Sequence, residues 1–243
     1  MIEILAEAWT WFTSAEQWSG PNGIPARTLE HLELSGLAIL VAVLLAVPPA
    51  LWLAHKRGAE FLASAVVNTG RAVPSFGIVV LAALLFLTWG VPVRFWSTVV
   101  ALIALALPPI FTNTYSAIRN VDPATVEAAR GMGLTERQLL LGVELPIGAP
   151  VILTGIRIAW AQVLATATLG AVISSGGGLG RYIVDGFATG AAGYDQVFGG
   201  AILVALLTLL GERAFDLTER LVLPVGIKRL LGRVDVDSAR QAA

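Results

Sequence analysis

Long stretches of apolar residues are the feature that most constrains how this chain can fold. A helix needs about 20 predominantly apolar residues to cross the hydrocarbon core of a bilayer. Only 14% of the residues are charged, against about 25% in an ordinary soluble domain, so much of the surface must face something other than water. We therefore predict an all-α integral membrane fold with about five transmembrane helices. The apolar stretches that reach or approach the required length are 32–54, 61–89 (with its apolar part at 72–89), 95–118, 151–173 and 197–210.

Prolines and polar residues inside or at the ends of these stretches indicate that the helices are more than anchors. Proline removes a backbone donor and kinks a helix, which a membrane protein tolerates where neighbouring helices or a water-filled cavity satisfy the freed groups. The sequence therefore predicts kinked helices around a transport pathway, with a purely structural bundle as the alternative. We expect Arg71 to lie at the cytoplasmic boundary, or else to face the interior of the bundle. The residues concerned are Pro48, Pro49, Pro74, Pro108, Pro109, Asn68, Arg71, Asn113 and Thr114.

Lysine and arginine are unevenly distributed over the segments between the apolar stretches. Cytoplasmic loops of membrane proteins carry an excess of these residues. The opposite side holds only Arg27, Arg94 and Arg181. The pattern predicts that the amino terminus is outside, the carboxyl terminus is cytoplasmic and the number of spans is odd. The basic residues on the predicted cytoplasmic side are Lys56, Arg57, Arg119, Arg130, Arg137, Lys228, Arg229, Arg233 and Arg240.

The two ends of the chain are expected to lie on opposite sides of the membrane. Residues 1–27 mix tryptophan with glutamate and lack the basic start and apolar run of a signal peptide. Because tryptophan favours the membrane–water boundary, we predict an extracytoplasmic amphipathic helix at 2–18, with a weakly held extension as the alternative. Residues 226–243 are expected to form a basic cytoplasmic tail, disordered from about residue 234.

The fifth apolar stretch continues as an amphipathic segment to residue 223. Asp216 and Arg220 are four residues apart, a spacing at which an ion pair contributes a few tenths of a kcal/mol to a helix. We predict a helix that runs along or just below the inner surface.

Several kinds of chemistry are excluded by the residues that the chain lacks or places apart. It contains no cysteine, so disulfides, thiolate metal sites and thiol nucleophiles are ruled out. Its two histidines, His31 and His55, lack metal-ligand spacing, and we expect them to be interfacial or loop residues. A phosphate-binding loop needs Gly-Lys-Ser/Thr, yet neither Lys56 nor Lys228 stands in such a sequence. We therefore expect no cofactor, no metal site and no enzymatic activity in this chain.

The segment 119–150 is the longest one on the predicted cytoplasmic side. Asp122 can cap a helix and Pro123 suits its first turn, while Gly131 and Gly133 can end it. A second helical stretch is expected at 135–142. Small residues on the first helix would let another protein's surface approach closely, although an ordinary loop helix with a glycine end is the alternative. These small residues are Ala124, Ala128 and Ala129.

The spacing within this segment resembles the motif of permeases of ATP-binding-cassette importers. Three residues separate Glu127-Ala128-Ala129 from Gly133, and nine residues separate Gly133 from Val143. One residue then separates Val143 from Leu145-Pro146. Val143 stands where isoleucine is more usual. In that family the short helix docks into a groove of the ATPase subunit and passes nucleotide-driven motion to the membrane helices. The resemblance implies this coupling role for Glu127, Ala128, Ala129, Arg130, Gly133, Leu145 and Pro146.

Other parts of the chain resemble one subgroup of these permeases, which imports glycine betaine, choline, carnitine and related osmoprotectants. The resemblance covers 28–225, which implies a type I (MetI-like) permease domain with a coupling loop at 119–150. The glycine-rich loop also resembles methionine and phosphonate permeases, so another small solute is the alternative, as is a non-ABC membrane transporter. The segments that carry the resemblance are 68–76, 107–118, 155–157, 165–169 and 175–180.

The resemblance also implies partners and a location. A separate ATP-binding-cassette ATPase dimer would hold ATP and magnesium, and an extracytoplasmic solute-binding protein would deliver the substrate. A second permease chain, identical or homologous, would complete the path. The chain would be a multi-pass protein of the bacterial cytoplasmic (inner) membrane, in contact with lipid and without a nucleic-acid partner.

Two further sets of residues are candidates for the transport path. The glycine-rich loop 174–193 is predicted to form an outer gate or a contact with the binding protein, with a compact turn as the alternative; its glycines include Gly176, Gly177, Gly178 and Gly180. Because a quaternary ammonium ion is attracted to aromatic faces, aromatic side chains inside the spans are candidate substrate contacts, with ordinary packing as the alternative. The candidates for the path are Phe111, Tyr115, Trp160, Asn68 and Arg71.

Overall fold

The computed structural model describes residues 2–57, 65, 74–90, 92–173 and 177–222, and no strand occurs among them. The all-α prediction is confirmed. The elements are α1 (Ile2–Thr13), η1 (Ala15–Trp18), α2 (Ile24–His55), α4 (Ser75–Trp89), α5 (Val93–Arg119), α6 (Pro123–Gly131), α7 (Glu136–Leu139), η2 (Leu140–Glu144), α8 (Leu145–Ile173), α9 (Gly180–Ala188), η3 (Gly190–Gly193) and α10 (Tyr194–Val222).

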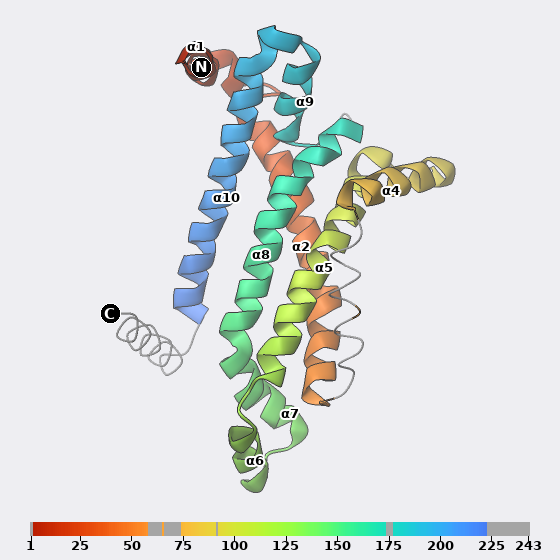
Figure 1. Cartoon of the computed structure of the whole chain (residues 1–243), viewed down its shortest axis with the longest axis vertical. Helices are drawn as coiled ribbons and strands as arrows, with labels where there is room; N and C mark the ends of the chain where they lie inside the picture. Colours follow the sequence, from red (N-terminus) through yellow and green to blue (C-terminus); the bar gives the residue numbers. More distant parts are fainter. Residues whose placement is uncertain (1, 58–64, 66–73, 91, 174–176, 223–243) are drawn as a thin grey trace.

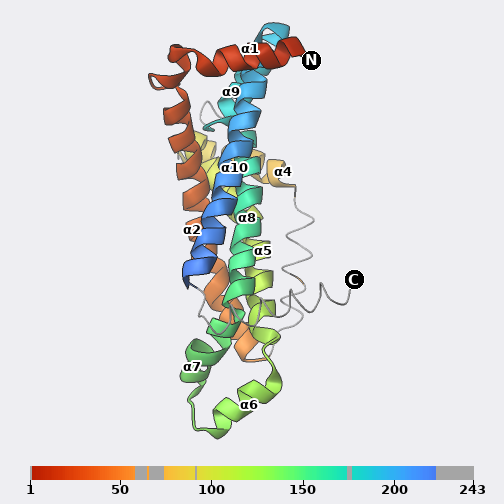
Figure 2. The ribbon, with the colours of Figure 1, turned by 90° about the vertical axis from the view of Figure 1, so that its left-hand side faces the viewer.

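The long helices form an elongated bundle. Helices α2, α5 and α8 run along its length, with α10 beside α8 and α4 lying across the upper part of α5 (Figure 1). Helix α1 lies across one end of the bundle, and α6 and α7 lie at the other end (Figure 2). The amino terminus and the segment 119–150 are therefore at opposite ends, as the charge pattern predicts.

Four helices are long and apolar enough to cross a membrane: Ile24–His55, Phe95–Arg119, Glu136–Val172 and Gly190–Glu219. They confirm four of the predicted spans and are longer than the apolar stretches themselves. The predicted stretch 61–89 is represented by the shorter apolar helix α4. Residues 58–64 and 66–73, with the path candidates Asn68 and Arg71, lie outside the described residues.

The core lies between α2, α5 and α8. On each helix a row of residues four positions apart is almost completely buried, and alanine predominates in the rows on α2 and α8. Rows at this spacing form the ridges by which helices interlock, and small side chains let helix backbones approach closely inside a membrane. The rows are Ala38, Ala42, Ala46, Ala50 and Ala54 on α2; Thr98, Leu102, Ala106, Ile110 and Thr114 on α5; and Ala159, Val163, Ala167 and Ala171 on α8.

Charged side chains join α8 to α10 within the bundle. The Arg157 guanidinium donates to a carboxylate oxygen of Glu212 and, at 2.8 Å, to Oδ1 of Asp216. A charge within an apolar helix is costly unless it is paired, and the two acidic residues supply that pairing. The predicted helix along the inner surface is therefore wrong: residues 212–222 continue α10, and Asp216 pairs with Arg157 of α8.

The predicted helix 2–18 is divided into α1, which ends at Thr13, and the 3-10 helix η1, and α1 packs on the bundle. Trp11 is 8% exposed and makes an edge-to-face contact with Tyr182 of α9, with ring centroids 5.1 Å apart. Trp9 and Trp18 on the other side are 72% and 52% exposed. The helix thus has one face on the bundle and a tryptophan-bearing face turned outward, which excludes the weakly held extension.

Gly155 tests the close packing of α5 on α8. A Cβ atom at Gly155 would lie 2.6 Å from Cβ of Asn113 and 2.9 Å from the carbonyl oxygen of Pro109, whereas one at Gly36 would meet nothing within 4 Å. We expect Gly155→Ala to lower the free energy of unfolding by about 1–3 kcal/mol, because overpacking forces the helices apart. Gly36→Ala should be neutral or stabilising by up to about 1 kcal/mol, since alanine is the better helix former. Thermal unfolding in detergent, followed by tryptophan fluorescence, measures both; equal midpoints would contradict this account of the packing.

Candidate coupling site

Helix α6 begins and ends where its sequence predicts. The Asp122 carboxylate accepts a hydrogen bond from the backbone N–H of Ala124 at 3.1 Å, which satisfies one of the free donors of the first turn. Pro123 occupies the first helical position, where its missing N–H costs nothing. After the helix, Gly133 has φ +85°, a left-handed conformation that glycine adopts without strain.

The two faces of α6 have different surroundings. Val126 and Ala129 are buried in a small cluster with Val121 and Leu139, whereas Glu127 and Ala128 are exposed. The prediction that Ala129 helps to form the approach surface is wrong, because its spacing of three from Val126 places it on the inward face. Other exposed residues of this segment are Ala124, Thr125, Arg130, Gly131, Met132 and Gly133.

A single helical turn, α7, follows and continues without a break into α8. Thr135 and Gln138 form a reciprocal capping box: the Gln138 side-chain oxygen accepts from the Thr135 backbone N–H at 2.9 Å. One π-helical turn, η2, then inserts before α8 and carries the buried Glu144. Such turns are frequent at functional sites. Leu145 and Pro146 form the first turn of α8, so the span begins earlier than the predicted residue 151.

An ionic chain connects α6, α7, α2 and η2. The Arg130 guanidinium donates to both carboxylate oxygens of Glu136 at 3.0 Å, which raises the pKa of Arg130. Glu136 Oε2 lies 2.9 Å from Nε2 of His55, and Nδ1 of His55 lies 2.6 Å from Oε2 of Glu144. His55 is the last residue of α2, so the end of that helix is held directly by the segment 119–150.

Both nitrogens of the His55 ring face carboxylate oxygens. A neutral imidazole has one donor and one acceptor, so this arrangement needs either an imidazolium ion or a proton on one carboxyl group. The side chains of His55 and Glu144 are 7% and 4% exposed, so His55, the last residue of the first apolar span, is a buried partner in an ionic contact and not a loop residue. Sequence reasoning missed this contact because Glu144 is 89 positions away.

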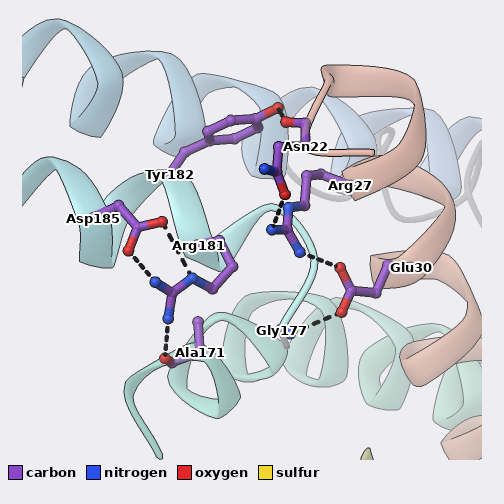
Figure 3. A network of polar contacts seen from close by, with 8 residues as sticks. All are labelled: Asn22, Arg27, Glu30, Ala171, Gly177, Arg181, Tyr182 and Asp185. Atoms are coloured by element: carbon purple, nitrogen blue, oxygen red, sulfur yellow. Dashed lines mark hydrogen bonds and ion pairs between the residues drawn. The ribbon is translucent and has the colours of Figure 1, made fainter. Parts of the chain in front are cut away.

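The opposite end of the bundle contains a second polar network (Figure 3). Arg27 donates to Glu30 at 2.7 Å, and the other oxygen of Glu30 accepts from the backbone N–H of Gly177 at 3.2 Å. Tyr182 of α9 donates its hydroxyl to the Asn22 carbonyl at 2.6 Å. These contacts attach the start of α2 to the glycine-rich segment and to α9.

The glycine-rich segment is packed more tightly than a loop. Gly178 has φ +55°, and a Cβ atom there would lie 2.6 Å from Cα of His31. Residues 180–188 form α9 and 190–193 form a 3-10 turn, so the predicted loop 174–193 is wrong over most of its length. Gly177 and Gly180 similarly approach Ala171 and Thr168 of α8; Gly176 lies outside the described residues.

His31 is also buried, near the start of α2. It is completely buried, and its Nε2 lies 3.0 Å from the carbonyl oxygen of Leu164 on α8. Gly178 can pack against it only because glycine has no side chain. Among the described residues, no group of three or more histidine, aspartate or glutamate side chains could hold a metal ion.

The aromatic candidates for the path belong to the core in this single chain. Phe111 and Tyr115 are 7% and 8% exposed and stack with ring centroids 6.4 Å apart. Trp160 packs against the same cluster and makes an edge contact with Phe215 of α10. Packing therefore accounts for the position of all three.

Comparison with known proteins identifies the family. Residues 36–223 match the model of the binding-protein-dependent transport system inner membrane component. The chain belongs to this family. It is therefore a multi-pass membrane protein and a transport component, consistent with its four apolar spans.

Its relatives include two permeases of closely related size. The chain is 35% identical over 205 residues to the choline transport system permease protein OpuBB of Bacillus subtilis, a match that covers 84% of this chain and 90% of that protein. It is 35% identical over 212 residues to the carnitine transport permease protein OpuCB of Listeria monocytogenes. That match covers 87% of this chain and 93% of the relative. The fold is similar to that of a chain of the inward-facing MetNI methionine ABC transporter, with a TM-score of 0.70 and 23% sequence identity. The match covers 83% of this chain and 96% of the transporter chain. The MetI-like permease fold is thus confirmed.

Gly178 and Gly90 offer a matched test of the close contact at the glycine-rich end. Both have positive φ, but a Cβ atom at Gly90 meets nothing within 4 Å. Gly90→Ala should cost about 1 kcal/mol for the left-handed backbone alone, whereas Gly178→Ala should cost clearly more because it also displaces α2 at His31. Unfolding midpoints in detergent measure the difference; equal losses would show that the contact with α2 does not constrain this residue.

Proposed function

We propose that this chain is the permease subunit of an ATP-binding-cassette importer that carries an osmoprotectant such as choline or glycine betaine across the cytoplasmic membrane. The observation that supports this most strongly is the likeness to choline and carnitine transport permeases over more than four fifths of the chain. Methionine as the solute is less well supported. The methionine transporter chain is only 23% identical in sequence, so its similarity is evidence for the fold and not for the solute.

The proposed orientation places α6 and α7 in the cytoplasm and the amino terminus outside. Its support is the charge distribution: Lys56, Arg57, Arg119, Arg130 and Arg137 lie at the α6 end, and Arg27 and Arg181 at the other. The permease domain would comprise 28–225, with 1–27 outside and the tail 226–243 in the cytoplasm. From residue 223 onward the chain lies outside the described residues.

The proposed partners follow from the family. An ATPase dimer would bind the exposed face of α6 through Glu127, Ala128 and Arg130, and would hold the ATP and magnesium, so that this chain has no catalytic role of its own. A second permease chain and an extracytoplasmic solute-binding protein would complete the importer. The four apolar spans and α4 leave many large side chains exposed for contact with lipid or with a second chain, among them Leu44, Leu81, Leu209 and Leu210.

The ionic chain suggests how motion of the ATPase would reach the membrane helices. A displacement of α6 acts on Glu136 through Arg130, then on the end of α2 through His55 and on the start of α8 through Glu144. Because α2 and α8 extend to the opposite end, where the glycine-rich segment contacts both, the outer gate assigned to Gly177, Gly178 and Gly180 would move with them. A cation–π role for Phe111, Tyr115 or Trp160 would require these helices to separate, since the three rings are packed in the core.

Charge reversal at the exposed face of α6 tests the docking role. In the reconstituted importer, we expect Glu127→Arg to reduce choline uptake and substrate-stimulated ATP hydrolysis at least about tenfold, because a mismatched charge at an interface costs several kcal/mol. Glu16→Arg, an equally exposed acidic residue at the opposite end, should leave ATPase coupling unchanged. Full coupling in the Glu127→Arg importer would refute the assignment of α6.

Removal of the histidine tests the transmission step. His55→Ala leaves Glu136 and Glu144 without their shared partner, and an unpaired buried carboxylate is strongly destabilising. We expect uptake per ATP hydrolysed to fall at least about tenfold, and we expect the His55→Ala/Glu144→Ala double variant to recover thermal stability but not coupling. Measuring uptake and ATP hydrolysis in the same proteoliposomes separates the two effects; an unchanged transport stoichiometry in His55→Ala would contradict the proposed route.

A further inference from the structure

A basic cavity opens beside the ionic chain and shares Arg130 with the surface assigned to the ATPase. It measures about 470 Å³ and lies between the last turn of α2 and the α6–α7 segment. Its lining includes Trp52, Lys56 and Arg57 from the end of α2 and Arg130, Glu136 and Arg137 from the α6–α7 segment. The mechanism proposed above uses Arg130 and Glu136 but leaves the other three basic residues without a role.

The cavity has an excess of positive charge. Its carboxylate, Glu136, has its two oxygens occupied by Arg130 and His55. Within the described part of the chain, Lys56, Arg57 and Arg137 form no ion pair, and all three are exposed. Lys56, Arg57 and Arg137 therefore give the cavity a positive charge that Glu136 does not balance, and an anion is the ligand that this charge favours.

The backbone at Arg57 supports a role for its side chain. Arg57 is the only non-glycine residue in the described chain with positive φ, at 52°. This position follows the helix end, where glycine is the usual residue because it adopts this conformation without strain. An arginine in this left-handed conformation carries a small backbone strain. A binding role for its guanidinium would explain why the strain is kept.

The position along α2 indicates what kind of anion binds. The three cations come immediately after the apolar span or from the segment packed against its end. Trp52, one turn before Lys56, is 59% exposed and lines the same cavity. Tryptophan is enriched at the level of lipid headgroups, so the cavity combines an apolar, lipid-facing wall with cations at the level where phosphates lie.

We propose that this cavity binds the phosphate group of an anionic phospholipid of the inner leaflet, with Lys56, Arg57 and Arg137 as its ligands. Basic pockets on the cytoplasmic side between membrane helices are suited to such headgroups. An acidic surface of the ATPase is less suitable, because Trp52 would then be buried against a charged protein face. The proposal rests on the orientation given under the proposed function.

The test uses the complete importer in nanodiscs of mixed phosphatidylglycerol and phosphatidylcholine. The variants are Lys56→Gln, Arg137→Gln and Arg57→Gly, the last of which removes the charge while relieving the backbone. Mass spectrometry of the co-purified lipid should show phosphatidylglycerol binding about fivefold weaker for each charge removed. Arg213→Gln is the matched control, since its side chain is 83% exposed on α10 and outside the cavity; it should retain the wild-type lipid ratio.

Three results would overturn the proposal. One is an unchanged phosphatidylglycerol ratio in the Lys56→Gln/Arg57→Gly double variant. Another is loss of the ATPase from that purified complex with lipid binding intact, which would assign the cavity to the partner. The third is equal binding of inorganic phosphate in phosphatidylcholine-only nanodiscs, which would make the ligand a free anion. Choline uptake by the same complexes is scored separately, so normal uptake with no lipid preference refutes the lipid site and leaves the transport function standing.

Discussion

A histidine held between two glutamates joins the first long helix to the segment that carries the candidate docking helix. Taking charged groups out of water costs several kcal/mol for each ion unless partners compensate it. His55 and Glu144, which are both buried, therefore stabilise one another, and the exposed Glu136 links them to Arg130. The same set fixes the start of α8, because Glu144 lies in the π-helical turn immediately before it. The contact makes α2, α7 and α8 one mechanical unit at this end of the bundle.

The remainder of the bundle keeps that unit stiff along its length. Rows of alanine and other small or aliphatic residues hold α2, α5 and α8 close together, and Arg157 ties α8 to α10 through two carboxylates. At the far end Gly177 and Gly178 bring the chain directly against α8 and α2. A displacement applied at α6 would thus be carried by packed helices rather than absorbed by a loop, which is what an importer that couples ATP hydrolysis to solute movement requires.

Features that depend on neighbouring residues could be predicted from the sequence. The apolar stretches, the cap at Asp122 and the proline and glycine limits of α6 follow from local periodicity or turn chemistry, and they reappear in the structure. The coupling motif is identified by its resemblance to a family. The difference in Lys and Arg content between the two ends of the bundle predicts its orientation in the membrane.

Features that depend on distant partners could not be predicted in the same way. Nothing beside His55 signals a glutamate 89 positions later, and Arg157 finds Glu212 only after a separation of 55. The inward face of Ala129 depends on how α6 packs against Leu139, and burial of His31 depends on α8 and the glycine-rich segment. The role of the aromatic path candidates likewise depends on helix packing, which one chain's sequence pattern does not define.

The proposed mechanism depends on binding of α6 to a nucleotide-hydrolysing partner beneath the membrane. The chain contains no cysteine, so Ala128→Cys introduces a unique thiol on the exposed face of α6 that can carry a photoreactive crosslinker. In membranes containing the whole importer, we expect this position to crosslink to the ATPase subunit. Crosslinking to the solute-binding protein, or reaction of the thiol with an impermeant reagent from outside the cell, would contradict it.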